Sequence, residues 1–173
     1  MTAAPTVELS VLTAPVLRAL LAGDLAAASR TAGVRLPPVF LEDGPLWLLR
    51  IGQIDADPAA EPWLIRAITV PGGEVVGHAG YHGPPDERGM VEVGYFVLEA
   101  HRRRGYARAA LRGLIAYAVE HRARVVRASV SPGNDASLAL VRSFGFVHIG
   151  EQWDDEDGLE LVFERPLVTP DGR

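Results

Sequence analysis

The sequence predicts an α/β (α+β) fold, in which a mixed sheet of about seven strands carries helices on both faces. Seven short segments have the alternating or continuous apolar residues that are typical of strands. Between them lie segments whose apolar residues are three and four positions apart, as in amphipathic helices. The predicted order is one strand, two or three helices, three strands, a helix, a strand, a helix and two strands. With 173 residues, 48% of them hydrophobic, the chain is expected to form a single domain over residues 1–173.

The first third of the chain is predicted to be a strand followed by helices. The strand is "TVELSVL" (6–12), in which apolar residues alternate with other residues. Helix signatures follow at 13–23, with Thr13 as the capping residue, and at 24–33, with Asp24 in that place; both segments end in glycine. A third helical segment, 44–58, comes after a loop broken by prolines.

The rest of the chain alternates strands with two further helices. The helices are expected to run from the arginine-rich turn after residue 101 to about Glu120, and over 134–145. Glycine- and proline-rich turns separate most of the strands. The strands are predicted at residues 62–70, 74–82, 90–98, 124–131, 146–154 and 158–165.

Composition excludes several classes of function. The chain has no cysteine, which excludes disulfides, thiolate metal sites and a cysteine nucleophile, and no metal is expected. It also has no lysine, which excludes a Walker-type phosphate loop. There is no apolar run long enough for a membrane span and no signal-peptide pattern at residues 1–10, so a cytoplasmic protein without membrane contact is expected.

The segment "HRRRGYARAAL" (101–111) stands out in a chain whose net charge is −5. Five arginines fall between Arg102 and Arg112, at a junction between a predicted strand and a predicted helix. Backbone N–H groups at a helix N-terminus favour anions, and Gly105 has no Cβ to keep a ligand away. The turn is therefore a candidate cradle for a pyrophosphate. The alternative is a solvated helix face.

Two motifs together identify a resemblance. "VEVGYFVLEAHRRRGYARAAL" resembles the acetyl-CoA motif of the GNAT (Gcn5-related N-acetyltransferase) superfamily, in which Arg102, Gly105 and Ala107 match the pattern Gln/Arg-x-x-Gly-x-Gly/Ala. "SPGNDASLALVRSFGF" is similar to the family's later strand-to-helix segment, through Asn134 and Ser137 and the closing Gly-Phe. The resemblance covers about residues 7–165 and implies a mostly antiparallel sheet. Within this superfamily, the sequence most resembles the branch that contains the ribosomal-protein alanine N-acetyltransferases.

The resemblance implies an enzyme, an acetyl-CoA-dependent N-acetyltransferase that acts on an amine. The amine would attack the thioester directly, since no cysteine is present to form a thiol acyl-enzyme. Backbone amides of the turn would bind the pyrophosphate of coenzyme A, the edge of the 90–98 strand would pair with the pantetheine arm, and Asn134 would bind that arm from the opposite side. Asn134 as a plain helix cap is the alternative. The implied cofactor-binding residues are Phe96, Val97, Leu98, Arg102, Arg103, Arg104, Gly105, Tyr106, Ala107, Asn134 and Ser137.

Glu92 is the best candidate for the base that takes the proton of the amine. It lies in the motif strand, where alternation places it on one face with Gly94 and Phe96, and many GNAT enzymes carry a glutamate at this place. The rivals are His78 and His82, and a solvent-facing carboxylate is the alternative without a catalytic role. Gly94 is expected to mark a bulge, and an amide at Phe96 or Val97 to stabilise the thioester oxyanion.

The usual proton donor to the leaving thiolate is missing. Many GNAT enzymes carry a tyrosine seven residues after the motif asparagine, where this chain has Val141. Ser137 is the substitute that the resemblance offers, and a coenzyme A thiolate can also leave without an acid.

The acceptor amine is not identified by the sequence, nor is the preferred acyl chain. Possible acceptors include a protein N-terminus, a polyamine, an amino acid and an antibiotic. Candidate lining residues are Glu42, Asp43, Trp47, Tyr81, Trp153 and the acidic run 154–157, which is otherwise a solvated turn.

Two other functions compete with catalysis. A catalytically weak acyl-CoA sensor or regulatory module on the same fold is one, and the missing tyrosine favours it. Nucleic-acid binding is the other, but the acidic net charge argues against it, so no nucleic-acid partner is expected. Homodimers are frequent in this superfamily, so a second copy of the chain is a candidate partner.

Overall fold

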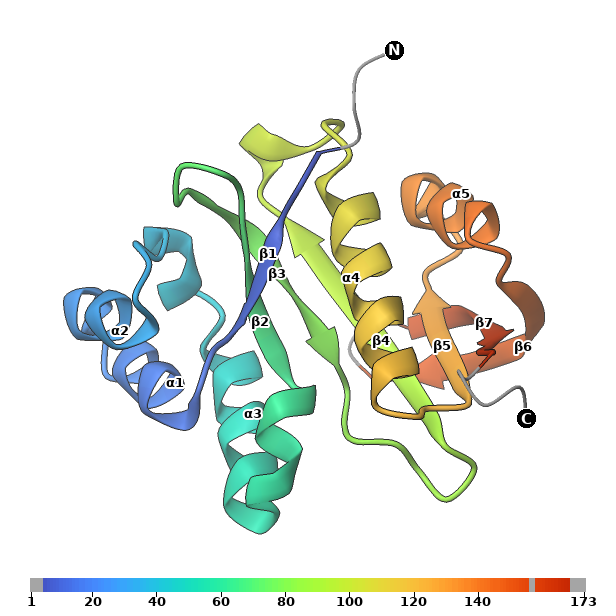
Figure 1. The fold of residues 1–173 in the computed structure, drawn as a ribbon, viewed down its shortest axis with the longest axis horizontal. Helices are drawn as coiled ribbons and strands as arrows, with labels where there is room; N and C mark the ends of the chain where they lie inside the picture. Colours follow the sequence, from blue (N-terminus) through green and yellow to red (C-terminus); the bar gives the residue numbers. More distant parts are fainter. Residues whose placement is uncertain (1–4, 156–157, 169–173) are drawn as a thin grey trace. The chain divides into compact units, whose positions relative to one another are not determined.

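The computed structural model describes residues 5–155 and 158–168, and Figure 1 shows its elements. The strands are β1 (Glu8–Val11), β2 (Ile65–Thr69), β3 (Val75–Tyr81), β4 (Met90–Val97), β5 (Val125–Val130), β6 (Val147–Asp154) and β7 (Gly158–Pro166). They form one sheet in the order β1-β2-β3-β4-β5-β7-β6. β4 and β5 pair in parallel, whereas β1–β2, β2–β3, β5–β7 and β6–β7 pair antiparallel. The prediction of a mixed, mostly antiparallel sheet of about seven strands is confirmed.

The helices lie where the sequence predicted them. They are α1 (Ala14–Leu21), α2 (Leu25–Ala32), α3 (Gly44–Ala56), α4 (Tyr106–Glu120) and α5 (Asp135–Ser143), with three short 3₁₀ turns, η1 (Pro38–Leu41), η2 (Pro58–Trp63) and η3 (Glu99–His101). Three α-helices therefore precede β2, the larger of the two numbers expected. The predicted strand over 62–70 begins too early, because Pro62 and Trp63 belong to η2 and β2 begins at Ile65.

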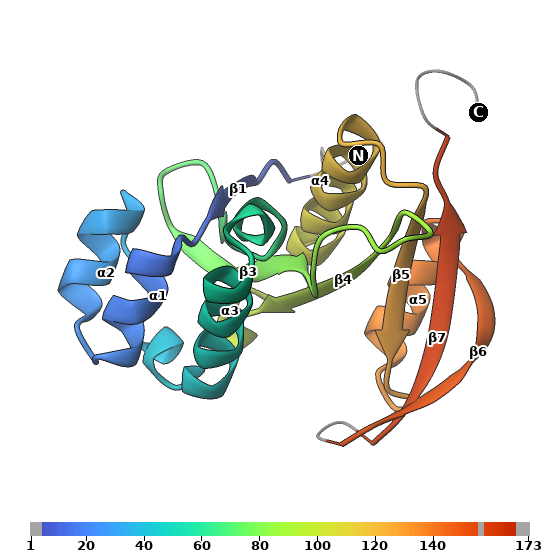
Figure 2. The ribbon, with the colours of Figure 1, turned by 90° about the horizontal axis from the view of Figure 1, so that it is seen from below.

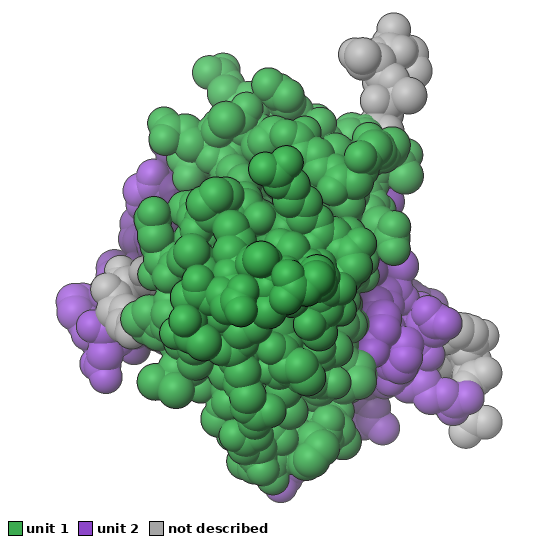
Figure 3. Space-filling view, turned by 90° about the vertical axis from the view of Figure 1, so that its left-hand side faces the viewer, with its two compact units in different colours: residues 1–84, 95–111 green, residues 85–94, 112–173 purple. Residues whose placement is uncertain are grey.

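The chain divides into two compact units, which Figure 3 colours separately. Unit 1 comprises residues 1–84 and 95–111, and unit 2 comprises residues 85–94 and 112–173. β4 and α4 each contribute residues to both units. The expectation that residues 1–173 form a single domain stays a prediction.

Unit 1 buries the apolar faces of its first three helices. Asp24 caps α2 as expected, because its Oδ1 accepts a hydrogen bond from the Ala27 amide at 2.8 Å. Thr13 makes no such bond at the start of α1; Glu61 Oε1 accepts the Ala14 amide instead, at 2.8 Å. A distant carboxylate thus replaces the local cap that the sequence predicted. The core of this unit includes Leu12, Val16, Leu17, Leu20, Phe40, Trp47, Ile51, Ile54, Leu64 and Ala67.

The strands of unit 1 approach each other unusually closely at two glycines of β3. A Cβ at Gly77 would lie 2.0 Å from the carbonyl oxygen of Phe96, and one at Gly80 would lie 1.7 Å from that of Leu64. Any larger residue would force the backbones apart. Gly77 therefore allows β3 to lie against the second half of β4, which the resemblance assigns to the cofactor, and Gly80 allows β3 to lie against the start of β2.

Unit 2 packs α5 on one face of β5, β7 and β6 (Figure 2). Along β5, Val126, Ala128 and Val130 are buried, whereas the alternate residues Arg127 and Ser129 are half-buried. The α5 side chain of Arg142 lies over the ring of Phe163 on β7, 5.7 Å from its centroid. Because side chains alternate along a strand, Arg127 and Ser129 project from the face opposite to the buried residues.

Within residues 5–155 and 158–168, no helix combines the length and the apolarity that crossing a membrane requires. The same residues include no group of three or more metal-ligating side chains placed to hold an ion. The longest helix, α4, has 15 residues and carries Arg108 and Arg112.

Candidate functional site

The arginine-rich turn forms the junction that the sequence predicted. η3 follows β4, and α4 begins at Tyr106. Two residues of the turn have left-handed backbone conformations, Arg103 with φ 62° and Gly105 with φ 82°. Among the described residues, no acceptor bonds the amides of Arg103, Arg104 or Gly105, and the first helical bond joins the Ala109 amide to the Gly105 carbonyl at 3.0 Å. The turn therefore presents a run of N–H donors at the positive end of the helix dipole, which suits a phosphate anion.

Arg102 is placed differently from the rest of the turn. Its amide already bonds the Glu99 carbonyl at 3.2 Å, which leaves the amides from Arg103 to Ala107 as the donors of the expected cradle. Its side chain folds back toward β4, where Nε donates to the Val97 carbonyl at 3.1 Å. The guanidinium lies over the Phe96 ring, 5.9 Å from the centroid. Arg102 thus contacts the strand assigned to pantetheine by the resemblance.

Only one of the three predicted pantetheine-pairing residues turns both backbone groups away from β3. The Leu98 amide bonds the Val76 carbonyl of β3 at 2.9 Å. Since every peptide bond described is trans, the Val97 carbonyl in the same peptide unit points the other way. In an extended strand the amide and the carbonyl of one residue point to the same side, so the Val97 amide also points away from β3. The Phe96 carbonyl points the opposite way, toward β3, where it lies against Gly77. Val97 therefore presents to a ligand at this edge its amide and the second lone pair of the carbonyl that Arg102 already bonds.

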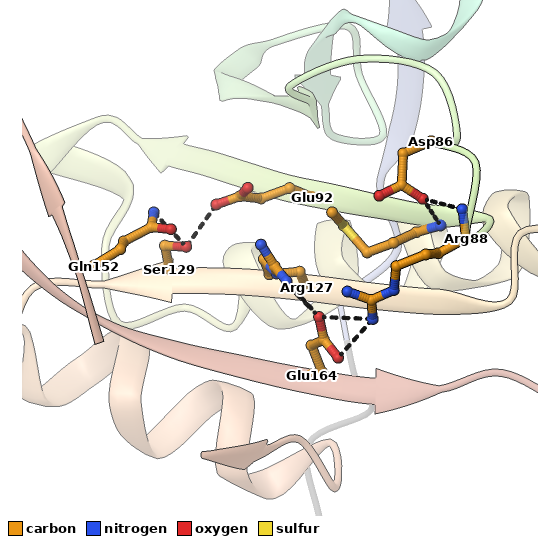
Figure 4. Close-up of polar contacts among 8 residues, drawn as sticks. Asp86, Arg88, Glu92, Arg127, Ser129, Gln152 and Glu164 are labelled. Atoms are coloured by element: carbon orange, nitrogen blue, oxygen red, sulfur yellow. Dashed lines mark hydrogen bonds and ion pairs between the residues drawn. The ribbon is translucent and has the colours of Figure 1, made fainter. Parts of the chain in front are cut away.

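Glu92 lies in unit 2, at the end of the ladder that pairs β4 with β5. The ladder between β4 and β5 in this unit runs from Met90 to Glu92, and Glu92 is opposite Arg127. The Ser129 hydroxyl donates to Glu92 Oε1 at 2.6 Å, and the amide nitrogen of Gln152 donates to the Ser129 oxygen at 3.1 Å (Figure 4). Gln152 Nε2 also donates to Glu160 Oε2 at 2.9 Å. The candidate base therefore belongs to a hydrogen-bonded chain.

A separate ion-pair group lies beside this chain. Arg127 donates from Nε and Nη2 to one oxygen of Glu164, at 3.1 and 2.6 Å, and Arg88 lies 3.4 Å from the other oxygen (Figure 4). Charge-assisted pairs of this kind are stronger than neutral hydrogen bonds. Although Arg127 is the register partner of Glu92, its guanidinium is engaged by Glu164 on the next strand.

Asn134 has the helix-capping role that was the alternative to binding the pantetheine arm. Asn134 precedes α5, and its Oδ1 accepts the Ser137 amide at 3.1 Å. The Asn134 side-chain N–H₂ takes no part in that bond and can donate to a ligand. Ser137 is half-buried, and Val141 is fully buried among apolar residues. The position of the missing tyrosine is therefore part of the core of unit 2.

The rival base His78 is enclosed in the core of unit 1. It is 9% exposed, and its ring contacts those of Phe40, Trp47 and Phe96 with centroid distances of 5.6, 5.6 and 5.3 Å. Its Nε2 lies 3.7 Å from Asp43 Oδ2. The other rival, His82, is exposed, and its carbonyl accepts a hydrogen bond from Gln53 Nε2 at 2.6 Å.

Two of the residues proposed to line an acceptor site are closed to solvent, whereas Glu42 is exposed. Trp47 and Tyr81 are buried in unit 1, where Trp47 Nε1 donates to the Phe40 carbonyl at 2.5 Å. Asp43 is partly exposed, whereas Trp153 in unit 2 is 76% exposed. Residues 156 and 157 of the acidic run lie outside the described residues.

Arg50 of α3 is also buried, and it was not among the residues predicted to have a role. Desolvation lowers the pKa of its guanidinium, which donates to Gln53 Oε1 at 2.8 Å and to the His82 carbonyl at 3.2 Å. These bonds tie α3 to the end of β3.

Sequence reasoning missed three polar residues of unit 2: Ser129, Gln152 and Glu160. The only signal in the sequence is alternation in "RVVRASVS", where Arg127 and Ser129 fall on the polar face. Their connection to Glu92 depends on how four strands are ordered and aligned. That order places β7 between β5 and β6, so Gln152 reaches across β7 to Ser129.

Comparisons with known proteins agree with the resemblance. The model of the acetyltransferase (GNAT) family matches residues 33–146, a range that includes Glu92, the arginine turn and Asn134. The chain is 41% identical over 83 residues to the N-alpha-acetyltransferase RimI of Mycobacterium tuberculosis, a match covering 46% of this chain and 49% of that protein. The chain spans about half the length of the curated relatives it matches.

Solved structures share the fold over nearly the whole chain. Ribosomal-protein-alanine N-acetyltransferase from Brucella melitensis is similar with a TM-score of 0.58 and 29% identity, covering 92% of this chain and 99% of that chain. Phosphinothricin acetyltransferase from Sinorhizobium meliloti, solved in complex with AcCoA, has a TM-score of 0.63 and 21% identity, covering 97% of this chain and 92% of that chain.

Proposed function

The chain belongs to the acetyltransferase (GNAT) family, and from that premise we propose that it transfers an acetyl group from acetyl-CoA to a primary amine. The observation that carries the proposal is the turn after β4. Left-handed backbone at Arg103 and Gly105 opens a run of unbonded amides at the start of α4. Such a turn suits the pyrophosphate of coenzyme A.

Three parts of the chain are proposed to hold acetyl-CoA. Amides from Arg103 to Ala107 bind the pyrophosphate, and the exposed Arg103 and Arg104 add positive charge at that turn. The Val97 carbonyl, which has a second lone pair beside the bond from Arg102, accepts from the pantetheine arm as in an added strand, and the Val97 amide is left for the thioester oxygen. Asn134 donates its side-chain N–H₂ to the same arm, while its oxygen continues to cap α5.

The chemical step is a direct displacement at the thioester. The amine nitrogen forms a bond to the acetyl carbon, the carbon–sulfur bond breaks, and coenzyme A leaves with that electron pair. An amine with an ordinary pKa of about 10 is protonated at neutral pH and must first lose a proton. Glu92 takes it, directly or through a water molecule. A backbone donor such as the Val97 amide stabilises the oxyanion, an effect typically worth about 3–4 kcal/mol.

Ser137 is the proposed proton source for the leaving thiolate. Its hydroxyl lies in the first turn of α5, one turn before Val141. A thiol with an ordinary pKa of about 8.5 also leaves as the thiolate without help, so this proton transfer assists the reaction and is not essential to it.

The acceptor class is proposed from relatives whose names refer to N-terminal amines, namely RimI and the alanine N-acetyltransferase of Brucella melitensis. The first acceptors to test are peptides with an N-terminal alanine. Spermidine, free amino acids and phosphinothricin complete the panel as small amines.

A free-thiol release assay with acetyl-CoA tests the proposal. Acceptor-dependent thiol release, with an acetyl group found on the acceptor by mass spectrometry, is the expected result. Acetyl-CoA binding by calorimetry without turnover for any amine would contradict catalysis and favour a sensor of acyl-CoA. Failure to bind acetyl-CoA at all would contradict both functions.

A further inference from the structure

The hydrogen-bonded chain that ends at Glu92 crosses one face of the sheet in unit 2. It takes one residue from each strand: Glu92 from β4, Ser129 from β5, Glu160 from β7 and Gln152 from β6. Gln152 and Glu160 are direct register partners, whereas Gln152 reaches Ser129 across β7. Each of the three bonds is 3.1 Å or shorter. The chain is therefore built by the fold, since no two of its members are neighbours in sequence.

Chemistry fixes the direction of every bond in this chain. An ionised Glu160 can only accept, so Gln152 must present its N–H₂ group to it. The second hydrogen of that group goes to the Ser129 oxygen. Ser129 has a single hydroxyl hydrogen, and with its oxygen accepting from Gln152 that hydrogen points to Glu92 Oε1. The direction of the hydrogen bond that Glu92 accepts is therefore set by Glu160, which acts through Gln152 and Ser129.

We propose that Ser129 and Gln152 are positioning residues of the acetyl transfer, which hold the Glu92 carboxylate in one orientation, ready to take the acceptor's proton. The inference rests on the proposed function, because it takes Glu92 as the base. A hydrogen bond donated to a carboxylate favours its charged form, which is the form that can accept a proton. It also restricts rotation of the carboxylate, so that the same oxygen stays bonded to Ser129.

The chain orients Glu92 but does not conduct protons. The Gln152 amide keeps both of its hydrogens, so the proton taken by Glu92 cannot leave through Gln152 to Glu160. Other charged groups of unit 2 face this region: Arg127, Arg88 and Glu164 form their own ion-pair group, and Glu160 anchors Gln152. None of these is altered by removing the Ser129 hydroxyl, so that change isolates the bond to Glu92.

Four variants test the inference. Ser129→Ala removes the donor, and Ser129→Thr keeps a hydroxyl at the same place. Gln152→Glu replaces the N–H₂ group with an acceptor, which draws the Ser129 hydroxyl away from Glu92. The double variant Ser129→Ala with Gln152→Glu separates this indirect effect from the added negative charge. Ser143→Ala is the matched control, because its hydroxyl bonds the Leu140 carbonyl at the exposed end of α5.

The readout is the pH dependence of kcat/KM in the thiol-release assay. A hydrogen bond to a charged group changes an equilibrium constant by about tenfold to hundredfold. Ser129→Ala and Gln152→Glu should therefore each shift the acidic limb of the kcat/KM profile to higher pH by about 1–2 units. At pH values below the acidic limb of the natural chain the activity should fall by about the same tenfold to hundredfold, and near pH 9 it should be nearly normal. Ser129→Thr and Ser143→Ala should follow the natural chain, and acetyl-CoA affinity should be unchanged in all.

The double variant decides whether Gln152 acts through Ser129. If it does, Gln152→Glu adds less than about twofold once the hydroxyl is absent, since the two residues then belong to one coupled unit. Additive effects, or a uniform fall in activity at every pH, would overturn the inference and leave both residues with a merely structural role.

A second measurement keeps the inference testable if no amine is turned over. The carboxyl carbons of ¹³C-labelled glutamate are titrated by NMR, and the Glu92 signal is assigned with Glu92→Gln. The midpoint of that titration should be higher in Ser129→Ala and in Gln152→Glu than in the natural chain. Equal midpoints would overturn the inference, whereas absent turnover with shifted midpoints would count against the proposed function alone.

Discussion

Oδ2 of Asp43 lies 3.7 Å from Nε2 of His78, and it is a buried oxygen without a hydrogen bond among the described residues. Asp43 occupies the N-cap position of α3 but makes no capping bond with its side chain. A carboxylate beside an imidazole is a common arrangement for a catalytic base. Here, however, the His78 ring is stacked on Phe96 and enclosed by two fully buried rings, those of Phe40 and Trp47.

Replacement of His78 by Gln is therefore expected to affect stability more than catalysis. Loss of three ring contacts, each worth about 0.5–1.5 kcal/mol, should lower the melting temperature by several degrees. The kcat/KM at neutral pH should fall by less than about tenfold, with the same pH profile. Thermal melts and thiol-release kinetics measure the two effects. A fall of more than about a hundredfold in a folded variant that still binds acetyl-CoA would transfer the role of base to His78.

A negative side chain at Gly105 should prevent binding of acetyl-CoA. Gly105→Asp places a carboxylate at the proposed pyrophosphate site, where like charges a few ångströms apart repel by about 1–4 kcal/mol. Calorimetry should show an affinity at least about fivefold weaker than that of the natural chain.

The control for this change is Gly33→Asp, because Gly33 ends α2 with φ 72°, close to the 82° of Gly105. Both variants carry similar backbone strain, but a Cβ at Gly33 meets no atom within 4 Å, whereas at Gly105 it would lie 3.1 Å from Pro5. Normal affinity in a folded Gly105→Asp would show that the pyrophosphate binds elsewhere.

Removal of the Ser137 hydroxyl should reduce turnover only modestly. Ser137→Ala keeps the backbone amide that Asn134 caps, so the melting temperature should stay within about two degrees. Because the thiolate can leave unaided, kcat should fall by about tenfold, less than the hundredfold or more typical of an essential acid. Steady-state kinetics with a saturating acceptor measure this. A loss of more than about a thousandfold would make Ser137 indispensable, and no loss would remove its role as proton donor.

The fold could be predicted because its signals are local. The period of apolar residues, the capping residue Asp24 and the glycines after the first two helices depend only on near neighbours along the chain. Where a distant residue intervenes, prediction fails. Glu61 takes over the cap at Ala14, 47 positions away, and no periodicity in the sequence indicates that bond.

The candidate site was predictable in its parts but not in its connections. Glu92 and the turn at Gly105 follow from motif positions. The structure places Glu92 in a strand and Gly105 in the turn before α4, as the motifs predict. The Ser129 and Gln152 contacts with Glu92 follow from the register between strands far apart in sequence, which a single sequence does not reveal. The same holds for Trp47 and Tyr81, which were expected at an open acceptor site but fill the core of unit 1.

Replacement of Glu92 by Gln should abolish most activity near neutral pH. The amide keeps the shape of the side chain and can still accept the Ser129 hydroxyl, but it cannot take a proton. General base catalysis is typically worth about 10²–10⁴-fold, so kcat/KM at pH 7 should fall by that amount. Acetyl-CoA affinity, measured by calorimetry, should be almost unchanged, because the backbone amides of the arginine turn are not altered.

The pH dependence of that deficit separates a base from a residue that only positions the acceptor. As the pH approaches the acceptor's own pKa of about 10, more of the amine arrives without its proton and needs no base. The ratio of natural to variant activity should therefore shrink toward high pH when the two profiles are measured with one acceptor. A constant ratio would assign Glu92 to positioning. Near-normal turnover of the variant at pH 7 would remove Glu92 from the mechanism and leave deprotonation to His82 or to solvent, since His78 is enclosed in the core.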